Sequence, residues 1–79
     1  MNPSKVYFTD LHVHGGTNLL LKLRKLIQAA GMEKIDFKNK FVALKIHFGE
    51  EGNLAYLRPN YVKVVADLVR EQGGVPFLT

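Results

Sequence analysis

The stretch Phe41-Val-Ala-Leu-Lys-Ile-His-Phe48 decides the fold, because its side chains alternate in character. Successive side chains of a β-strand point to opposite faces of the sheet. One face of this stretch is wholly apolar and carries Val42, Leu44, Ile46 and Phe48. The other face carries Ala43, Lys45 and His47. A parallel strand enclosed on both faces is apolar throughout, so the pattern predicts a strand with one covered face and one open face.

Helical and extended patterns alternate on both sides of this strand. Apolar residues recur at helical spacing over Asn18 to Ala30 and from about Pro59 to Gln72, which predicts two helices. Thr17 is the expected N-terminal cap of the first helix. Short β-branched and aromatic stretches predict two further strands, at Lys5 to Thr9 and at Val75 to Thr79.

The order of these elements predicts an α/β fold. It is a β-α-β-α-β arrangement, in which two helices accompany a three-stranded parallel sheet, half of a doubly wound, Rossmann-like sheet. We expect both helices on one face, so that the spatial order is sequential and residues 41–48 form the middle strand. The alternative order, two-one-three, places the helices on opposite faces and would bury Lys45.

A chain of 79 residues has room for one domain. Half of a doubly wound sheet leaves one face uncovered, and ligand loops normally begin at the carboxyl edge where the last predicted strand ends. We therefore expect residues 1–79 to be a single partial α/β domain, the N-terminal piece of a longer protein whose remaining polypeptide covers the open face. A complete small domain that pairs with a second copy through this face is the alternative.

Composition narrows the functional classes. The chain has no cysteine, so it holds neither a disulfide nor a Cys-ligated iron–sulfur cluster of its own. Its apolar runs are too short for a membrane span or a signal peptide, and we expect a cytoplasmic protein. The net charge is +4. Seven basic side chains gather between residues 22 and 45: Lys22, Arg24, Lys25, Lys34, Lys38, Lys40 and Lys45.

This basic region makes a small nucleic-acid-binding module the alternative function. The two aromatic residues within this region, Phe37 and Phe41, are assigned to packing and to the central strand rather than to stacking on single strands. A solvated surface is therefore favoured, and nucleic acid is not the expected partner. A small anionic ligand is the expected one.

The candidate ligand site follows the central strand. Ligands of open α/β sheets bind beyond the carboxyl ends of the strands. A lysine within a sheet strand must reach water, an acid or an anion, and glycines at positions 49 and 52 leave backbone amides open. The predicted ligand-binding residues are Lys45, His47, Glu50, Asn53 and Arg58. A lysine extending to solvent and an ordinary surface arginine are the alternatives.

His12 and His14 form a His-x-His pair in the loop before the first helix. Imidazoles suit zinc, nickel, iron or manganese, so the pair is a candidate metal site. Because such pairs are common in proteins that bind no metal, solvated loop histidines are the alternative.

Several segments together resemble a known family. They are Lys45-Ile-His-Phe-Gly-Glu50, Gly52-Asn53, Arg58-Pro59-Asn60-Tyr61, Gly73-Gly74-Val-Pro-Phe-Leu-Thr79 and the opening Lys5-Val-Tyr-Phe-Thr-Asp10. They resemble the start of a family of uncharacterised iron–sulfur-centre proteins, a domain of unknown function often joined to a ferredoxin-type module. Its members are several times longer than this chain.

The resemblance implies that the chain belongs to an iron–sulfur protein, but it implies no particular reaction. It implies an N-terminal fragment whose 4Fe-4S cluster belongs to cysteines beyond the matched stretch, with no cofactor in this chain. The five candidate ligand-binding residues lie within the matched segments, whereas His12 and His14 lie outside them.

Overall fold

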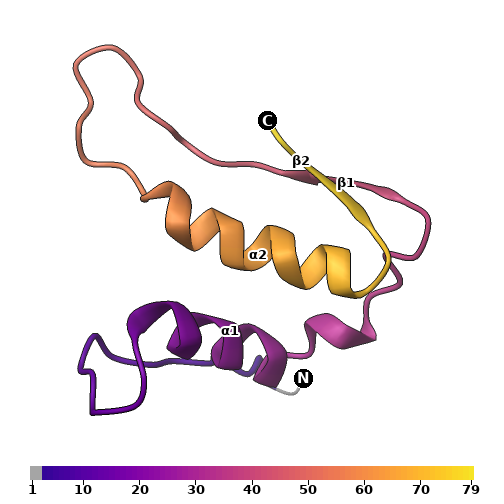
Figure 1. The fold of residues 1–79 in the computed structure, drawn as a ribbon, viewed down its shortest axis with the longest axis horizontal. Helices are drawn as coiled ribbons and strands as arrows, with labels where there is room; N and C mark the ends of the chain where they lie inside the picture. The colour runs from indigo at the N-terminus through magenta and orange to yellow at the C-terminus, as the bar shows by residue number, and fades with distance from the viewer. Residues whose placement is uncertain (1–2) are drawn as a thin grey trace.

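A computed structural model describes residues 3–79 of the chain (Figure 1). The elements follow in the order α1 (Leu19–Ala29), the short 3-10 helix η1 (Met32–Lys34), β1 (Phe41–Leu44), α2 (Pro59–Glu71) and β2 (Val75–Leu78). The two strands are parallel and form one sheet. The predicted α/β class, with two helices and parallel strands, is therefore confirmed.

The sheet is short, and α2 is the crossover between its strands. The register runs from Phe41 opposite Val75 to Leu44 opposite Leu78. The backbone N–H of Ile46 still donates to the carbonyl of the last residue at 3.2 Å. β1 is therefore shorter than the strand predicted over residues 41–48.

The predicted alternation of faces is confirmed. The face toward α2 carries half-buried Val42, Leu44 and Ile46, whereas exposed side chains alternate with them at Ala43, Lys45 and His47. Phe41 lies on this second, open face with 81% of its surface exposed. The sheet therefore has one face covered by α2 and one face open, as the sequence pattern indicates.

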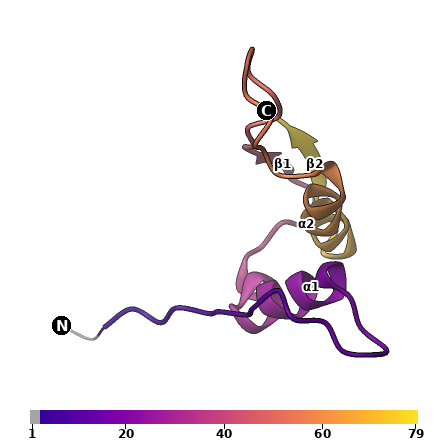
Figure 2. The same ribbon diagram turned by 90° about the vertical axis from the view of Figure 1, so that its left-hand side faces the viewer.

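The elements stack in three layers (Figures 1 and 2). The sheet lies on one side of α2 and α1 lies on the other, so that α2 is the middle layer. We expected both helices to lie against the same face of the sheet. They do lie on the same side of it, but only α2 covers the strands, because the apolar stripe of α1 packs against α2.

The third strand expected at Lys5 to Thr9 is not seen in the described part of the chain, so the three-stranded sheet is not confirmed. Contacts made by Asp10 and His12, just after this segment, explain why it does not join the sheet. The Lys22 ammonium on α1 donates to the backbone carbonyl of Asp10 at 2.8 Å and to that of His12 at 2.5 Å. This holds the segment in the layer of α1, which α2 separates from the sheet.

The core is small and centres on α2. The buried hydrophobic residues among those described are Val62, Leu68 and Val69, all on α2. Gly74 is buried beside them, just before β2. A Cβ atom at position 74 would lie 2.7 Å from Cγ1 of Val69 and 3.0 Å from Cβ of Phe37. Only glycine therefore lets the chain leave α2 this close to the core.

The helix ends follow capping chemistry. The side chain of Asn18 accepts a hydrogen bond from the backbone N–H of Leu21 at 2.9 Å, so Asn18 is the N-cap and the expectation of Thr17 is wrong. Gly31 adopts the left-handed conformation after the helix, with a φ of 96°, as glycines at helix C-termini commonly do. Neither helix of residues 3–79 is long and apolar enough to cross a bilayer.

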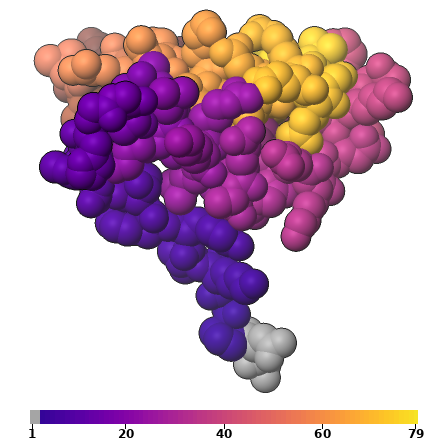
Figure 3. All heavy atoms as spheres, turned by 60° about the horizontal axis from the view of Figure 1, so that its bottom comes forward, coloured from indigo at the N-terminus to yellow at the C-terminus, as the bar shows by residue number. Residues whose placement is uncertain are grey.

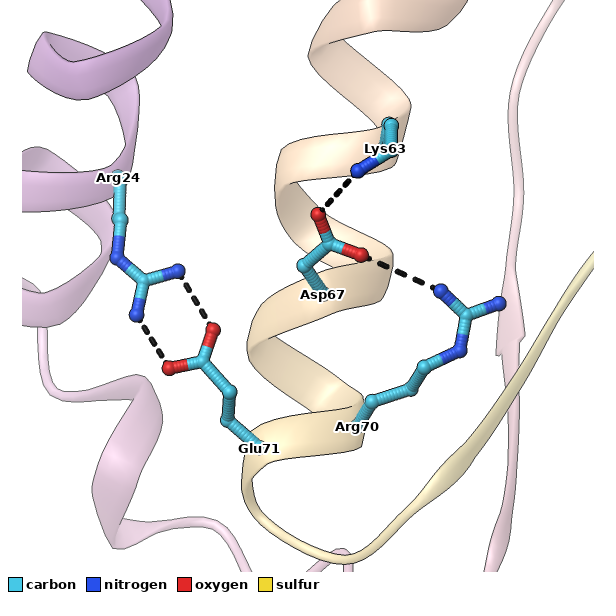
Figure 4. A network of polar contacts seen from close by, with 5 residues as sticks. All are labelled: Arg24, Lys63, Asp67, Arg70 and Glu71. Atoms are coloured by element: carbon cyan, nitrogen blue, oxygen red, sulfur yellow. Dashed lines mark hydrogen bonds and ion pairs between the residues drawn. The ribbon is translucent and has the colours of Figure 1, made fainter.

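One ion pair joins the two helices, and two more lie along α2 (Figure 4). The guanidinium of Arg24 on α1 makes two hydrogen bonds to the carboxylate of Glu71 on α2, one of them at 2.6 Å. Asp67 accepts from Lys63 at 2.7 Å and from Arg70 at 3.3 Å along α2. The Arg24–Glu71 pair joins the layers of α1 and α2 through a bidentate contact.

Candidate functional site

The candidate site lies in the long excursion between β1 and α2 (Figure 1). The chain runs on from β1 to Phe48, reverses, and returns to α2 at Pro59. Gly49 and Gly52 have φ values of 97° and 82°, a conformation that other residues adopt only with strain. A Cβ at Gly49 would also lie 3.3 Å from the ring of Tyr56. The two glycines therefore make this reversal possible.

Four of the five predicted ligand-binding residues meet at one open hollow of ≈ 560 Å³. They are Lys45, His47, Glu50 and Asn53. Ile46, Ala55, Tyr56 and Leu57 complete its lining. The hollow therefore combines charged and polar groups with an apolar wall.

His47 and Glu50 form a direct pair within this hollow. Nδ1 of His47 lies 2.7 Å from Oε1 of Glu50. The carboxylate favours a proton on Nδ1, which leaves Nε2 as the second hydrogen-bonding atom of the ring. Both side chains are exposed, so the pair contributes little to stability. Its effect is to orient the imidazole.

Lys45 brings positive charge to the same hollow. It lies on the open face of the sheet and is exposed. No ion pair joins its ammonium to a carboxylate within residues 3–79. The ammonium reaches solvent, and its charge is not neutralised by a contact within the described part of the chain.

Asn53 and Arg58 differ in their relation to the hollow. The side-chain oxygen of Asn53 accepts from the backbone N–H of Ala55 at 3.0 Å, so its amide NH₂ remains the group that can donate to a ligand. Arg58 precedes α2 as its N-cap residue, without a capping hydrogen bond from its side chain. It does not line the hollow.

The apolar wall was not among the candidate residues derived from the sequence. Tyr56 is its largest side chain, and its ring packs against Gly49. The sequence offers one sign of it, the aromatic Tyr56 within Leu54-Ala-Tyr-Leu57, in a loop that contains glycines. That signal is weak, because only the folded reversal brings Tyr56 beside the polar residues.

His12 and His14 lie together, away from the hollow. Their ring centroids are 4.4 Å apart and the rings meet edge to face at 82°. The nearby carboxylate of Asp10 pairs with the Lys22 ammonium at 2.7 Å, and this contact lowers the pKa of Asp10. Within residues 3–79 no group of three or more His, Cys, Asp or Glu side chains could hold a metal. A metal on this pair would need further ligands from elsewhere.

Part of the basic region forms ion pairs within the chain. Three of its seven basic side chains pair with carboxylates: Lys22 with Asp10, Arg24 with Glu71 and Lys40 with Asp36. The other four, Lys25, Lys34, Lys38 and Lys45, are exposed and form no ion pair within residues 3–79. The nucleic-acid alternative stays a prediction.

No family model matches this chain, and no similar protein is found among curated proteins or solved structures. The iron–sulfur cluster that the resemblance implies does not fit this chain itself, because the sequence contains no cysteine to ligate it.

Proposed function

We propose that the hollow after β1 binds a small anionic ligand, a phosphate or a carboxylate. The observation that carries the proposal is the shared lining of this hollow by Lys45, Asn53 and His47. Lys45 and Asn53 donate hydrogen bonds, and the ring of His47 donates from Nε2 when both of its nitrogens carry a proton. Charge-assisted hydrogen bonds from lysine are among the stronger contacts to such anions.

Each side chain has a separate role in this proposal. Lys45 supplies the positive charge. Glu50 holds His47 in one orientation through the 2.7 Å contact, so that Nε2 meets the ligand. Asn53 donates from its amide. Arg58 stands outside the hollow at the start of α2, where it adds positive potential beside the helix N-terminus.

An NMR titration tests the proposal. Inorganic phosphate, a nucleotide and a dicarboxylate are added in turn to the 15N-labelled chain. We expect concentration-dependent shifts at residues 45–53 and weaker shifts at Arg58. Lys45→Gln should abolish binding, whereas Lys34→Gln, a matched change on η1 outside the lining, should leave it unchanged. Equal responses of the two variants would refute the proposed site.

We also propose that the chain is the N-terminal α/β piece of an iron–sulfur-centre protein. Support comes from the resemblance of the segments at residues 45–50, 52–53, 58–61 and 73–79. The coding sequence after residue 79 tests this. A downstream C-x2-C-x2-C-x3-C-P run would support the cluster protein, and a stop codon at that point would contradict it.

A further inference from the structure

The N-terminal arm, residues 3–9, leaves the body of the molecule as an extended segment (Figures 2 and 3). Its apolar side chains are displayed rather than packed: Val6 is 88% exposed and Phe8 is 84% exposed. These two residues are two positions apart, so in a strand they share one face. The arm therefore carries an apolar face that the described part of the chain leaves uncovered.

The residues that follow the arm, Asp10 and His12, are anchored by Lys22. The Lys22 ammonium contacts the carboxylate and carbonyl of Asp10 and the carbonyl of His12, all within 2.8 Å. Because Lys22 belongs to α1, the arm starts from the layer farthest from the sheet of its own chain (Figure 2). This anchoring favours an acceptor outside the chain.

One edge of the sheet is able to accept a strand. The carbonyls of Lys40 and Leu44 accept from β2, and the N–H of Ile46 donates to it. Backbone groups alternate between the two edges of a strand, so the odd-numbered residues Phe41 and Ala43 direct theirs away from β2. That outer edge of β1 has no strand partner within residues 3–79.

The outer edge of β2 is a poorer acceptor. The N–H groups of Val75 and Thr79 point to β1, so position 76 faces the other way. It is occupied by Pro76, which has no N–H to donate. A strand that joins this sheet is therefore directed to β1.

An apolar hollow lies beside the open edge of β1. It measures ≈ 320 Å³, and its lining includes Leu44 of β1, Leu23 of α1, and Tyr61 and Val65 of α2. Lys45 is its one charged lining residue, and no residue of β2 lines it. It is therefore placed where the inward face of a strand added to β1 would lie. Two side chains such as those of Val6 and Phe8 match its apolar character.

The exposed area fits association with a second copy. The accessible surface is 6565 Å², whereas a compact monomer of 8.9 kDa exposes about 4,800 Å². The excess of roughly 1,700 Å² per chain is more than the roughly 800 Å² that each partner buries in a standard interface. The radius of gyration, 14.5 Å, likewise exceeds the roughly 12 Å of a compact chain of this length.

We infer that two copies of this chain exchange their N-terminal arms: residues 5–9 of each copy add as a parallel third strand to the outer edge of β1 in the other. Val6 and Phe8 fill the hollow beside β1 of the partner copy. The exchange is reciprocal, so it closes as a symmetric dimer. It places the strand expected at Lys5 to Thr9 beside β1, but in a second molecule. The hollow that it fills shares Lys45, Ile46 and Leu57 with the lining of the proposed anion site.

Sedimentation equilibrium of the full chain tests the dimer. We expect a mass of twice 8.9 kDa at micromolar concentration. Val6→Asp combined with Phe8→Asp should raise the dimer dissociation constant at least about 100-fold, since burial of both side chains is lost. The matched control, Tyr7→Asp with Thr9→Asp, changes the net charge equally on the outward face and should remain dimeric. A monomeric unmodified chain, or equal behaviour of both variants, would overturn the inference.

Cross-linking distinguishes exchange from closure within one chain. The chain has no cysteine, so Tyr7→Cys and Ala43→Cys each introduce a single thiol. A short bifunctional maleimide should join the two variants only when they are mixed and refolded together. A chain carrying both thiols that cross-links to itself as a monomer would overturn the exchange. Circular dichroism of each variant confirms that it remains folded.

Discussion

The closest contact in the core provides the sharpest test of the packing. Val69 is the one fully buried side chain of the described core, and Gly74 approaches it so closely that an added Cβ would lie 2.7 Å from its Cγ1. Val69→Ala removes two methyl groups, which costs about 1.6 kcal/mol in transfer free energy. The cavity left behind adds about 1 kcal/mol if the site does not collapse. We expect a loss of unfolding free energy of about 2.5 kcal/mol.

The second half of the test is Gly74→Ala. The added methyl collides with Val69 and with Phe37, and overpacking of this kind costs about 1–3 kcal/mol. In the double variant the new methyl occupies space that Val69→Ala has vacated. We therefore expect the double variant to be more stable than the sum of the single effects predicts, by about 1–2 kcal/mol.

Urea unfolding followed by circular dichroism measures these free energies at one protein concentration. Gly15→Ala is the matched control, since a Cβ there meets nothing within 4 Å; it should change the unfolding free energy by less than about 0.5 kcal/mol. Strict additivity of Val69→Ala and Gly74→Ala would refute the packing described between α2 and the start of β2.

Three further predictions concern charge, capping and the loop. Arg24 lowers the pKa of Glu71 below its ordinary value of 4.5, so the pair stabilises the fold above that pH and its contribution disappears as the pH falls through the lower folded-state value. Glu71→Gln should therefore reduce the loss of stability on acidification, measured as the urea midpoint across the acid range; an unchanged pH dependence would contradict the pairing. Asn18→Ala should cost about 1 kcal/mol of unfolding free energy, and Thr17→Ala should cost clearly less, with the reverse ranking contradicting the cap. Gly49→Ala should weaken phosphate binding in the NMR titration, because a φ of 97° and the ring of Tyr56 both oppose a Cβ. An unchanged affinity would show that the conformation of this loop is not needed for binding.

The candidate site was predictable in part because its residues are close in the sequence. Lys45 and His47 share a strand face because side chains alternate along a strand. Glu50 follows three residues after His47. Arg58 was grouped with them as an arginine at a helix entrance beside a glycine-containing loop. It does lie at the start of α2, but it does not line the hollow. Tyr56 joins the lining only because the loop reverses at its glycines.

The amino-acid sequence by itself determined the local elements: the two helices and the alternating faces of β1. These depend on periodicity and backbone conformation within a few neighbouring residues. Only the tertiary structure decided which surfaces meet. The stripe of α1 packs on α2 instead of the sheet, and the segment at Lys5 to Thr9, although strand-like in composition, lies beside no strand edge in residues 3–79. A strand exists only where a second backbone supplies its hydrogen bonds, and that partner is not encoded in the strand's own residues.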